Sequence, residues 1–135
     1  MILLDTHAFL ILAMGGAVHA AAVEAIATAD RPPMLSAVSA WEIALLATRT
    51  GRTSLIFPRD IRGWFDEAMI RMRLREIPLD SRAAIESRLL PGGFHDDPAD
   101  RFLVATARIQ GATLITRDQH ILDYAAAGHV KALRC

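Results

Sequence analysis

The chain has 135 residues, of which 53% are hydrophobic and 22% are charged, and its formal net charge is zero. This length predicts one domain over residues 1–135, burying about two-thirds of the surface of the unfolded chain. The apolar content excludes a disordered chain and predicts a full core or a buried partner surface. No apolar run reaches the roughly 20 residues of a membrane span, and no basic stretch precedes the first apolar run. We therefore expect a cytoplasmic protein with no membrane association.

Apolar periodicity and capping residues divide the chain into alternating strands and helices. In chain order they predict a strand at 2–4, helices at 8–14 and 18–29, a strand at 34–35, a helix from a cap at Ser36 or Ser39 to Gly51, a helix at 60–72, a strand at 74–79, helices at 80–90 and 97–110, a strand at 113–115, a helix at 118–127 and a strand at 129–133. This alternation favours an α/β fold with a mainly parallel sheet covered on both faces.

Four acidic residues fall where such a fold gathers its ligands, beyond the carboxyl ends of the strands. Asp5 ends the first strand, Glu42 is expected in the first turn after the second strand, and Asp118 follows the strand at 113–115. Asp100 lies in the first turn of a helix capped by Asp97, where it can face the other acids. We therefore expect Asp5, Glu42, Asp100 and Asp118 to share one crevice.

Such a group of carboxylates calls for a cation, because acids held close together take up protons unless a positive ion is present. Oxygen ligands favour a hard ion, so the expected cofactor is Mg²⁺ or Mn²⁺. With no nucleophile beside the acids, the set predicts metal-assisted hydrolysis of a phosphodiester. Thr6, Ser39 and Thr116 stand next to the acids and are expected to orient a carboxylate or a water molecule.

Each acid also has a structural interpretation. Asp5 and Asp118 can be simple helix caps, and Asp100, at the third helical position, can stabilise the helix dipole. Glu42 is harder to explain in that way, because a charge inside an apolar stretch is costly unless it faces a site. His95 has no second histidine at ligand spacing, so a loop or phosphate-contact role is preferred to a transition-metal site.

Four short motifs occur in order along the chain: Leu3-Leu4-Asp5-Thr6-His7-Ala8-Phe9-Leu10, Ser36-Ala37-Val38-Ser39-Ala40-Trp41-Glu42-Ile43-Ala44, His95-Asp96-Asp97-Pro98-Ala99-Asp100-Arg101 and Thr116-Arg117-Asp118. Together they resemble the PIN-domain toxins of VapBC type II toxin–antitoxin systems, the VapC family. The resemblance implies a three-layer α/β/α fold and Mg²⁺- or Mn²⁺-dependent endoribonuclease activity. It maps the metal ligands onto Asp5, Glu42 and Asp118, and its Asp-Pro-x-Asp-Arg pattern points to Asp100, with Asp97 as the cap.

The resemblance also implies partners. These are a cognate VapB-like antitoxin that inhibits the enzyme, an RNA substrate, and a second copy in a homodimer, with higher assembly when the antitoxin is bound. Between Arg49 and Arg75, seven arginines outnumber three acids by four charges, which can hold an RNA backbone. The candidate RNA contacts are Arg49, Arg52, Arg71, Arg73 and Arg101.

Three alternatives remain. A receiver domain would need a phosphorylatable Asp after a central strand near the middle of the chain and a Lys near the end; Lys131 is present, but no such Asp is. A haloacid-dehalogenase-type phosphatase would need Asp at position 7, where this chain has His7. A catalytically dead interaction module has no support in the sequence, because all four acids are present.

Overall fold

A computed structural model describes residues 1–50 and 55–135. Its strands are β1 (Ile2–Leu4), β2 (Met34–Ser36), β3 (Arg75–Ile77), β4 (Thr113–Thr116) and β5 (Lys131–Arg134). Its helices are α1 (Thr6–Ala13), α2 (Ala20–Ala27), α3 (Ala37–Thr48), α4 (Ile61–Arg71), α5 (Ser81–Arg88), α6 (Pro98–Gln110) and α7 (Gln119–Ala126). The predicted order of elements is confirmed, with ends that shift by a few residues. The predicted helix end at Gly51 lies outside the described residues.

The five strands pair in parallel, in the order β3-β2-β1-β4-β5. The chain builds outward from the central strand β1 to β3, then crosses back and continues on the other side of β1 with β4. The strand order therefore reverses between β1 and β4, which is the point where parallel α/β sheets bind their ligands. The predicted α/β fold with a parallel sheet is confirmed.

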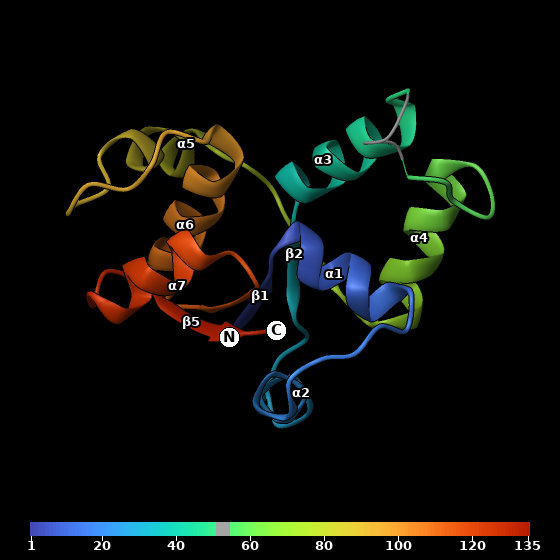
Figure 1. Ribbon diagram of the computed structural model, residues 1–135, viewed down its shortest axis with the longest axis horizontal. Helices are drawn as coiled ribbons and strands as arrows, with labels where there is room; N and C mark the ends of the chain where they lie inside the picture. Colours follow the sequence, from blue (N-terminus) through green and yellow to red (C-terminus); the bar gives the residue numbers. More distant parts are fainter. Residues whose placement is uncertain (51–54) are drawn as a thin grey trace.

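Two hydrophobic cores lie on opposite faces of the sheet, because successive side chains of a strand point to opposite sides. Leu4 packs with Phe9 of α1 and Trp64 of α4 in one core, whereas its neighbour Leu3 packs with Val104 of α6 in the other. Figure 1 shows the result, with α1, α3 and α4 on one side of the sheet and α5, α6 and α7 on the other. None of the helices in the described ranges has the length and apolar character needed to cross a bilayer.

Side-chain caps begin six of the described helices, and four of these caps belong to helices that border the candidate site. The caps of α1, α3, α6 and α7 are Asp5, Ser36, Asp97 and Asp118, and each side chain accepts a hydrogen bond from a backbone N–H of the first turn. Capping of this kind stabilises a helix by about 1 kcal/mol. Because α1, α3 and α7 directly follow β1, β2 and β4, these caps place polar side chains along one edge of the sheet.

Candidate active site

The site is built around the point where β1 and β4 end. Asp5 is buried, and its carboxylate accepts hydrogen bonds from the backbone N–H of Ala8, at 2.6 Å, and from the Thr116 hydroxyl. Thr116 Oγ1 in turn accepts the backbone N–H of Asp118 at 2.9 Å. Asp118 caps α7 through the N–H of Ile121 at 3.0 Å, which leaves its second carboxylate oxygen available to a ligand.

Glu42 reaches the site from α3. Its Oε1 accepts a hydrogen bond of 2.5 Å from the Thr6 hydroxyl, which also lies 3.0 Å from the buried hydroxyl of Ser39. The expected position of Glu42 in the first turn after β2 is wrong, since Ser36 caps the helix and Glu42 falls in its second turn. Glu42 still reaches the site from the second turn of α3, because its carboxylate bonds to Thr6 at the start of α1.

Asp100 lies in the first turn of α6, whose cap Asp97 accepts the Asp100 backbone N–H at 3.0 Å. The predicted cap and the predicted third helical position are both confirmed. His95 Nε2 lies 3.1 Å from Asp100 Oδ2. The loop before α6 therefore contributes a side chain to the site.

The charges of the acids act on one another. Burial is the largest cause of the rise in the pKa of Asp100, and nearby negative charges bring that pKa to about 7; these charges belong to Asp97, Asp118, Glu42 and Asp5. Burial also raises the pKa of Asp5 and of Glu42, partly offset by hydrogen bonds from threonine hydroxyls. An acid whose pKa is raised by burial and then by four neighbouring acids marks a site that gains from a cation.

The donor set fits a divalent cation. Asp100 and Asp118 each offer a carboxylate oxygen, and these atoms and a ring nitrogen of His95 lie within 4.8 Å of one another. Asp5 and Glu42 do not belong to this closest group, although both raise the pKa of Asp100 through their charge. Carboxylate oxygens suit Mg²⁺ or Mn²⁺. The structure thus gathers Asp100 and Asp118 most tightly, with Asp5 and Glu42 around them.

Two histidines lie beside the acids of the site. His95 was interpreted as a loop or phosphate-contact residue, yet its Nε2 is buried and has no hydrogen-bond partner among the described residues. His7 partly offsets the rise that burial causes in the pKa of Asp5 and Glu42. The signal for His95 was its place two residues before the cap of α6, where a loop side chain can fold back over the helix start.

The candidate RNA contacts lie in different surroundings. Arg49 follows α3, and Arg71 and Arg73 lie at the end of α4; all three are exposed. Arg71 donates a 2.7 Å hydrogen bond to the carbonyl of Ala13, at the end of α1 that points away from the acids. An eight-residue helix is about 12 Å long, so Arg71 is a helix length from the carboxylates. Arg52 lies outside the described residues.

Arg101 requires a correction. Its side chain is buried, with 6% exposure, and its guanidinium donates to the carbonyl oxygens of Ser87 at 2.8 Å, Phe94 at 2.7 Å and His95 at 3.1 Å. A guanidinium that is buried and bonded to three carbonyl oxygens of its own chain is poorly placed to donate to an RNA phosphate. Arg101 instead ties the end of α5 and the loop before α6 to α6.

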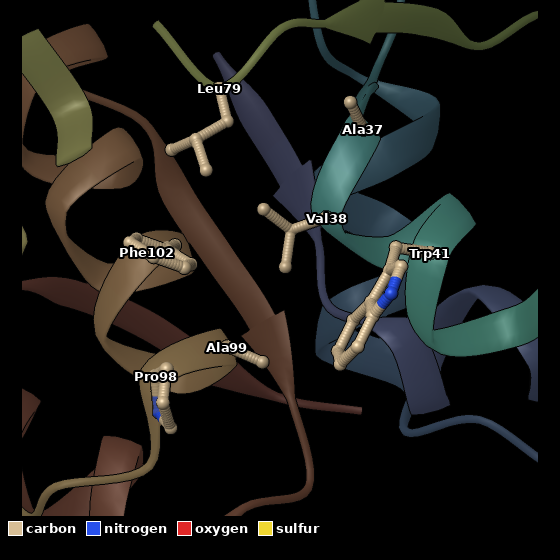
Figure 2. Close-up of a pocket in the computed structure, with 7 residues that line it drawn as sticks. All are labelled: Ala37, Val38, Trp41, Leu79, Pro98, Ala99 and Phe102. Carbon is tan, nitrogen blue, oxygen red and sulfur yellow. The ribbon is translucent and has the colours of Figure 1, made fainter. Parts of the chain in front are cut away.

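An apolar groove lies between α3 and α6, and its lining includes Trp41 and Ala99, the sequence neighbours of Glu42 and Asp100 (Figure 2). Its volume is about 320 Å³, and it is lined by Ala37, Val38, Trp41, Leu79, Pro98, Ala99 and Phe102. In Figure 2 the residues of α3 face those of α6 across the groove. Trp41, adjacent to Glu42, is 62% exposed. An exposed tryptophan beside an apolar groove indicates a contact surface.

Comparisons with known proteins show the family of the chain. The sequence profile of the PIN domain matches residues 2–127. Ribonuclease VapC22 of Mycobacterium tuberculosis is 32% identical over 124 residues, 91% of each chain. The solved structure of VapBC2 from Rickettsia felis, bound to a DNA fragment from its promoter, aligns with a TM-score of 0.71 at 14% identity, covering 99% of this chain and 98% of that one.

A second solved structure, the sarcin-ricin loop cleaving toxin VapC20 of Mycobacterium tuberculosis, aligns with a TM-score of 0.57 at 23% identity, covering 97% of this chain and 98% of that one. The profile match excludes the receiver-domain and haloacid-dehalogenase alternatives, since it spans nearly the whole chain. The chain therefore belongs to the PIN-domain family, in the group of VapC toxins of VapBC toxin–antitoxin systems.

Proposed function

We propose that this chain is a Mg²⁺- or Mn²⁺-dependent endoribonuclease, the toxin of a type II toxin–antitoxin system, that hydrolyses RNA at a site formed by Asp5, Glu42, Asp100 and Asp118. The observation that carries the proposal is the approach of Asp100 and Asp118, whose ligand atoms lie within 4.8 Å of each other. Burial raises the pKa of Asp100, and the charges of Asp97, Asp118, Glu42 and Asp5 raise it further. A relative named as a ribonuclease, 32% identical over 91% of the chain, supports RNA as the substrate.

The residues of the chain have separate tasks in this proposal. Asp100 and Asp118 present carboxylate oxygens to the cation, and Asp5 and Glu42 supply further negative charge around it. When bound, the cation would lower the pKa of a water and stabilise the departing oxygen of the phosphodiester. The hydroxyls of Thr116 and Thr6 hold Asp5 and Glu42 in fixed orientations.

The partner that we propose is a cognate VapB-like antitoxin. Support comes from structural neighbours that are themselves complexes, among them a toxin–antitoxin complex from Klebsiella pneumoniae with a TM-score of 0.61 at 20% identity, covering 98% of this chain and 96% of that one. The chain presents large apolar side chains to the solvent, including Ile56 at 93% and Ile70 at 77% exposure. Ile56 lines one groove with the exposed Met14, and exposed apolar side chains that lie together indicate a binding partner.

The second partner that we propose is another copy of the chain. Trp41 is exposed and lines the groove between α3 and α6. This surface patch therefore offers both a large protruding side chain and a recess. A twofold dimer needs such a self-complementary patch. Trp41→Arg should therefore shift the chain to a monomer in light scattering at micromolar concentration, whereas Ile85→Arg, on the exposed face of α5, should not. An unchanged mass for the Trp41 variant would reject this face as the dimer contact.

The activity is tested with purified chain freed of any partner. We expect cleavage of RNA that requires Mg²⁺ or Mn²⁺ and is lost with EDTA, and a decrease of about 10²-fold or more in Asp5→Asn. Asp123→Asn is the matched control, because Asp123 is an exposed acid on α7 that bonds Gln119. Metal-independent cleavage that Asp5→Asn leaves unchanged would refute the assignment.

A further inference from the structure

The acids of the site differ in how their carboxylates are held. Asp5 accepts bonds from the Thr116 hydroxyl and a backbone N–H, Glu42 from a threonine hydroxyl, and Asp118 from the backbone N–H of Ile121. The Asp100 carboxylate accepts no such bond from the described residues. A carboxylate that binds a cation works best when a neighbouring donor fixes its direction.

His95 is the polar side chain placed to fill that role. Its Nε2 lies 3.1 Å from Asp100 Oδ2, is buried, and has no bond of good geometry within the described part of the chain. Bonds of this kind are often poorly aligned before the ligand arrives and tighten when it binds. The His95 nitrogen, which lacks an acceptor, therefore lies beside the Asp100 carboxylate, which lacks a donor.

The ring of His95 is held in place on several sides. Its centroid lies 4.4 Å from that of Phe94 and 4.5 Å from that of His120. The carbonyl oxygens of Phe94 and His95 both accept bonds from the buried Arg101 guanidinium. A ring fixed by aromatic neighbours and by its own backbone can set the direction of another side chain.

The hydrogen-bond network also assigns which ring nitrogen carries the proton. Nδ1 of His95 accepts the backbone N–H of Asp97 at 3.3 Å. In the neutral ring the proton then lies on Nε2, which makes this nitrogen a donor toward Asp100 and leaves it no lone pair for a metal. The closeness of Nε2 to Asp100 is thus better explained by a hydrogen bond than by metal ligation.

We propose that His95 is a positioning residue for the cation site, donating from Nε2 to the Asp100 carboxylate and holding that carboxylate toward Asp118. This inference rests on the metal site of the proposed function. It adds a residue whose effect is on the strength of cation binding, through Asp100, without contact between His95 and the cation.

Two substitutions separate this role from its alternatives. His95→Phe keeps an aromatic ring beside Phe94 and His120 but removes the donor, whereas His95→Gln removes the ring but keeps an N–H donor. Mn²⁺ binding to the full chain is measured by calorimetry, and thermal melting verifies folding. We expect His95→Gln to bind within about threefold of the unsubstituted chain, and His95→Phe to bind about 10- to 100-fold more weakly.

A spectroscopic measurement on the unsubstituted chain is independent of the folding of any variant. Pulsed EPR of the Mn²⁺-loaded protein detects nitrogen coupling when an imidazole binds the ion, and we expect no coupling from His95. Coupling that disappears in both variants would make His95 a ligand and overturn the positioning role. Strong binding by His95→Phe with weak binding by His95→Gln would overturn it in favour of packing alone.

The failure of this inference is distinguishable from failure of the proposed function. Asp118→Asn should abolish Mn²⁺ binding if the metal site exists. Loss of binding in Asp118→Asn, with affinity unchanged in His95→Phe, would retain the metal site and reject the role of His95. An unsubstituted chain that binds no Mn²⁺ would reject both.

Discussion

The Thr116 hydroxyl donates a hydrogen bond to the Asp5 carboxylate, joining residues 111 positions apart in the sequence. The two residues stand at the ends of the paired strands β4 and β1. The same Thr116 oxygen accepts the backbone N–H of Asp118. One buried hydroxyl thus sets the spacing of two acids on either side of the point where the strand order reverses.

Removing that hydroxyl should weaken both folding and cation binding. In Thr116→Val the free energy of unfolding should decrease by about 1.5–3 kcal/mol, the contribution of a hydrogen bond to a charged group. Because this bond lowers the pKa of Asp5, its loss should raise that pKa further and weaken Mn²⁺ binding about 10- to 100-fold. Urea denaturation and calorimetry measure the two effects. Thr106→Val, which removes a buried hydroxyl bonded within α6, should leave Mn²⁺ binding unchanged.

The pH dependence of stability should report on Asp100. Its pKa is raised from 3.8 to about 7, so between these values the folded chain holds a proton that the unfolded chain has released. Stability contributed by this group is therefore lost as pH rises from about 4 to about 7. In EDTA, the melting temperature of the unsubstituted chain should fall over this window relative to that of Asp100→Asn, and Mg²⁺ at pH 8 should restore it. A difference that stays constant with pH would contradict the raised pKa.

Arg101 should matter for stability and not for direct contact with RNA. Arg101→Met leaves three internal carbonyl oxygens without their donor and should decrease the free energy of unfolding by about 3 kcal/mol or more. Arg101→Lys should restore little of it, because an ammonium group cannot replace the planar guanidinium. Arg108→Met, on the exposed side of the same helix, is the control for denaturation. A stable Arg101→Lys variant with weakened RNA binding would instead support an RNA contact.

The exposed arginines remain candidates for RNA contact. Replacing Arg49 and Arg71 with Gln should weaken binding to a catalytically inactive Asp5→Asn chain and flatten its salt dependence by about 1.4 in slope, if each touches one phosphate of a single strand. Replacing Arg82 and Arg88 of α5 removes the same charge elsewhere. Equal salt slopes for both double variants would show that Arg49 and Arg71 are ordinary surface residues.

Local signals in the sequence predicted much of the fold. The cap at Asp97 followed by Pro98 marks the start of α6, and Gly111, with φ of 62°, marks its end, because a left-handed residue without a Cβ stops a helix at little cost. The position of Glu42 was one turn wrong because two serines could each cap α3. Ser36 caps it, and the Ser39 hydroxyl instead contacts Thr6, 33 residues away.

The sequence by itself determined the order of strands and helices, the family and the candidate acids, because each depends on residues close together in the chain. Only the tertiary structure decided which side chains meet. The link between Asp5 and Thr116, the approach of His95 to Asp100 and the burial of the charged Arg101 all join separate segments. Such contacts depend on how the helices pack across the parallel sheet, which no spacing within one segment specifies.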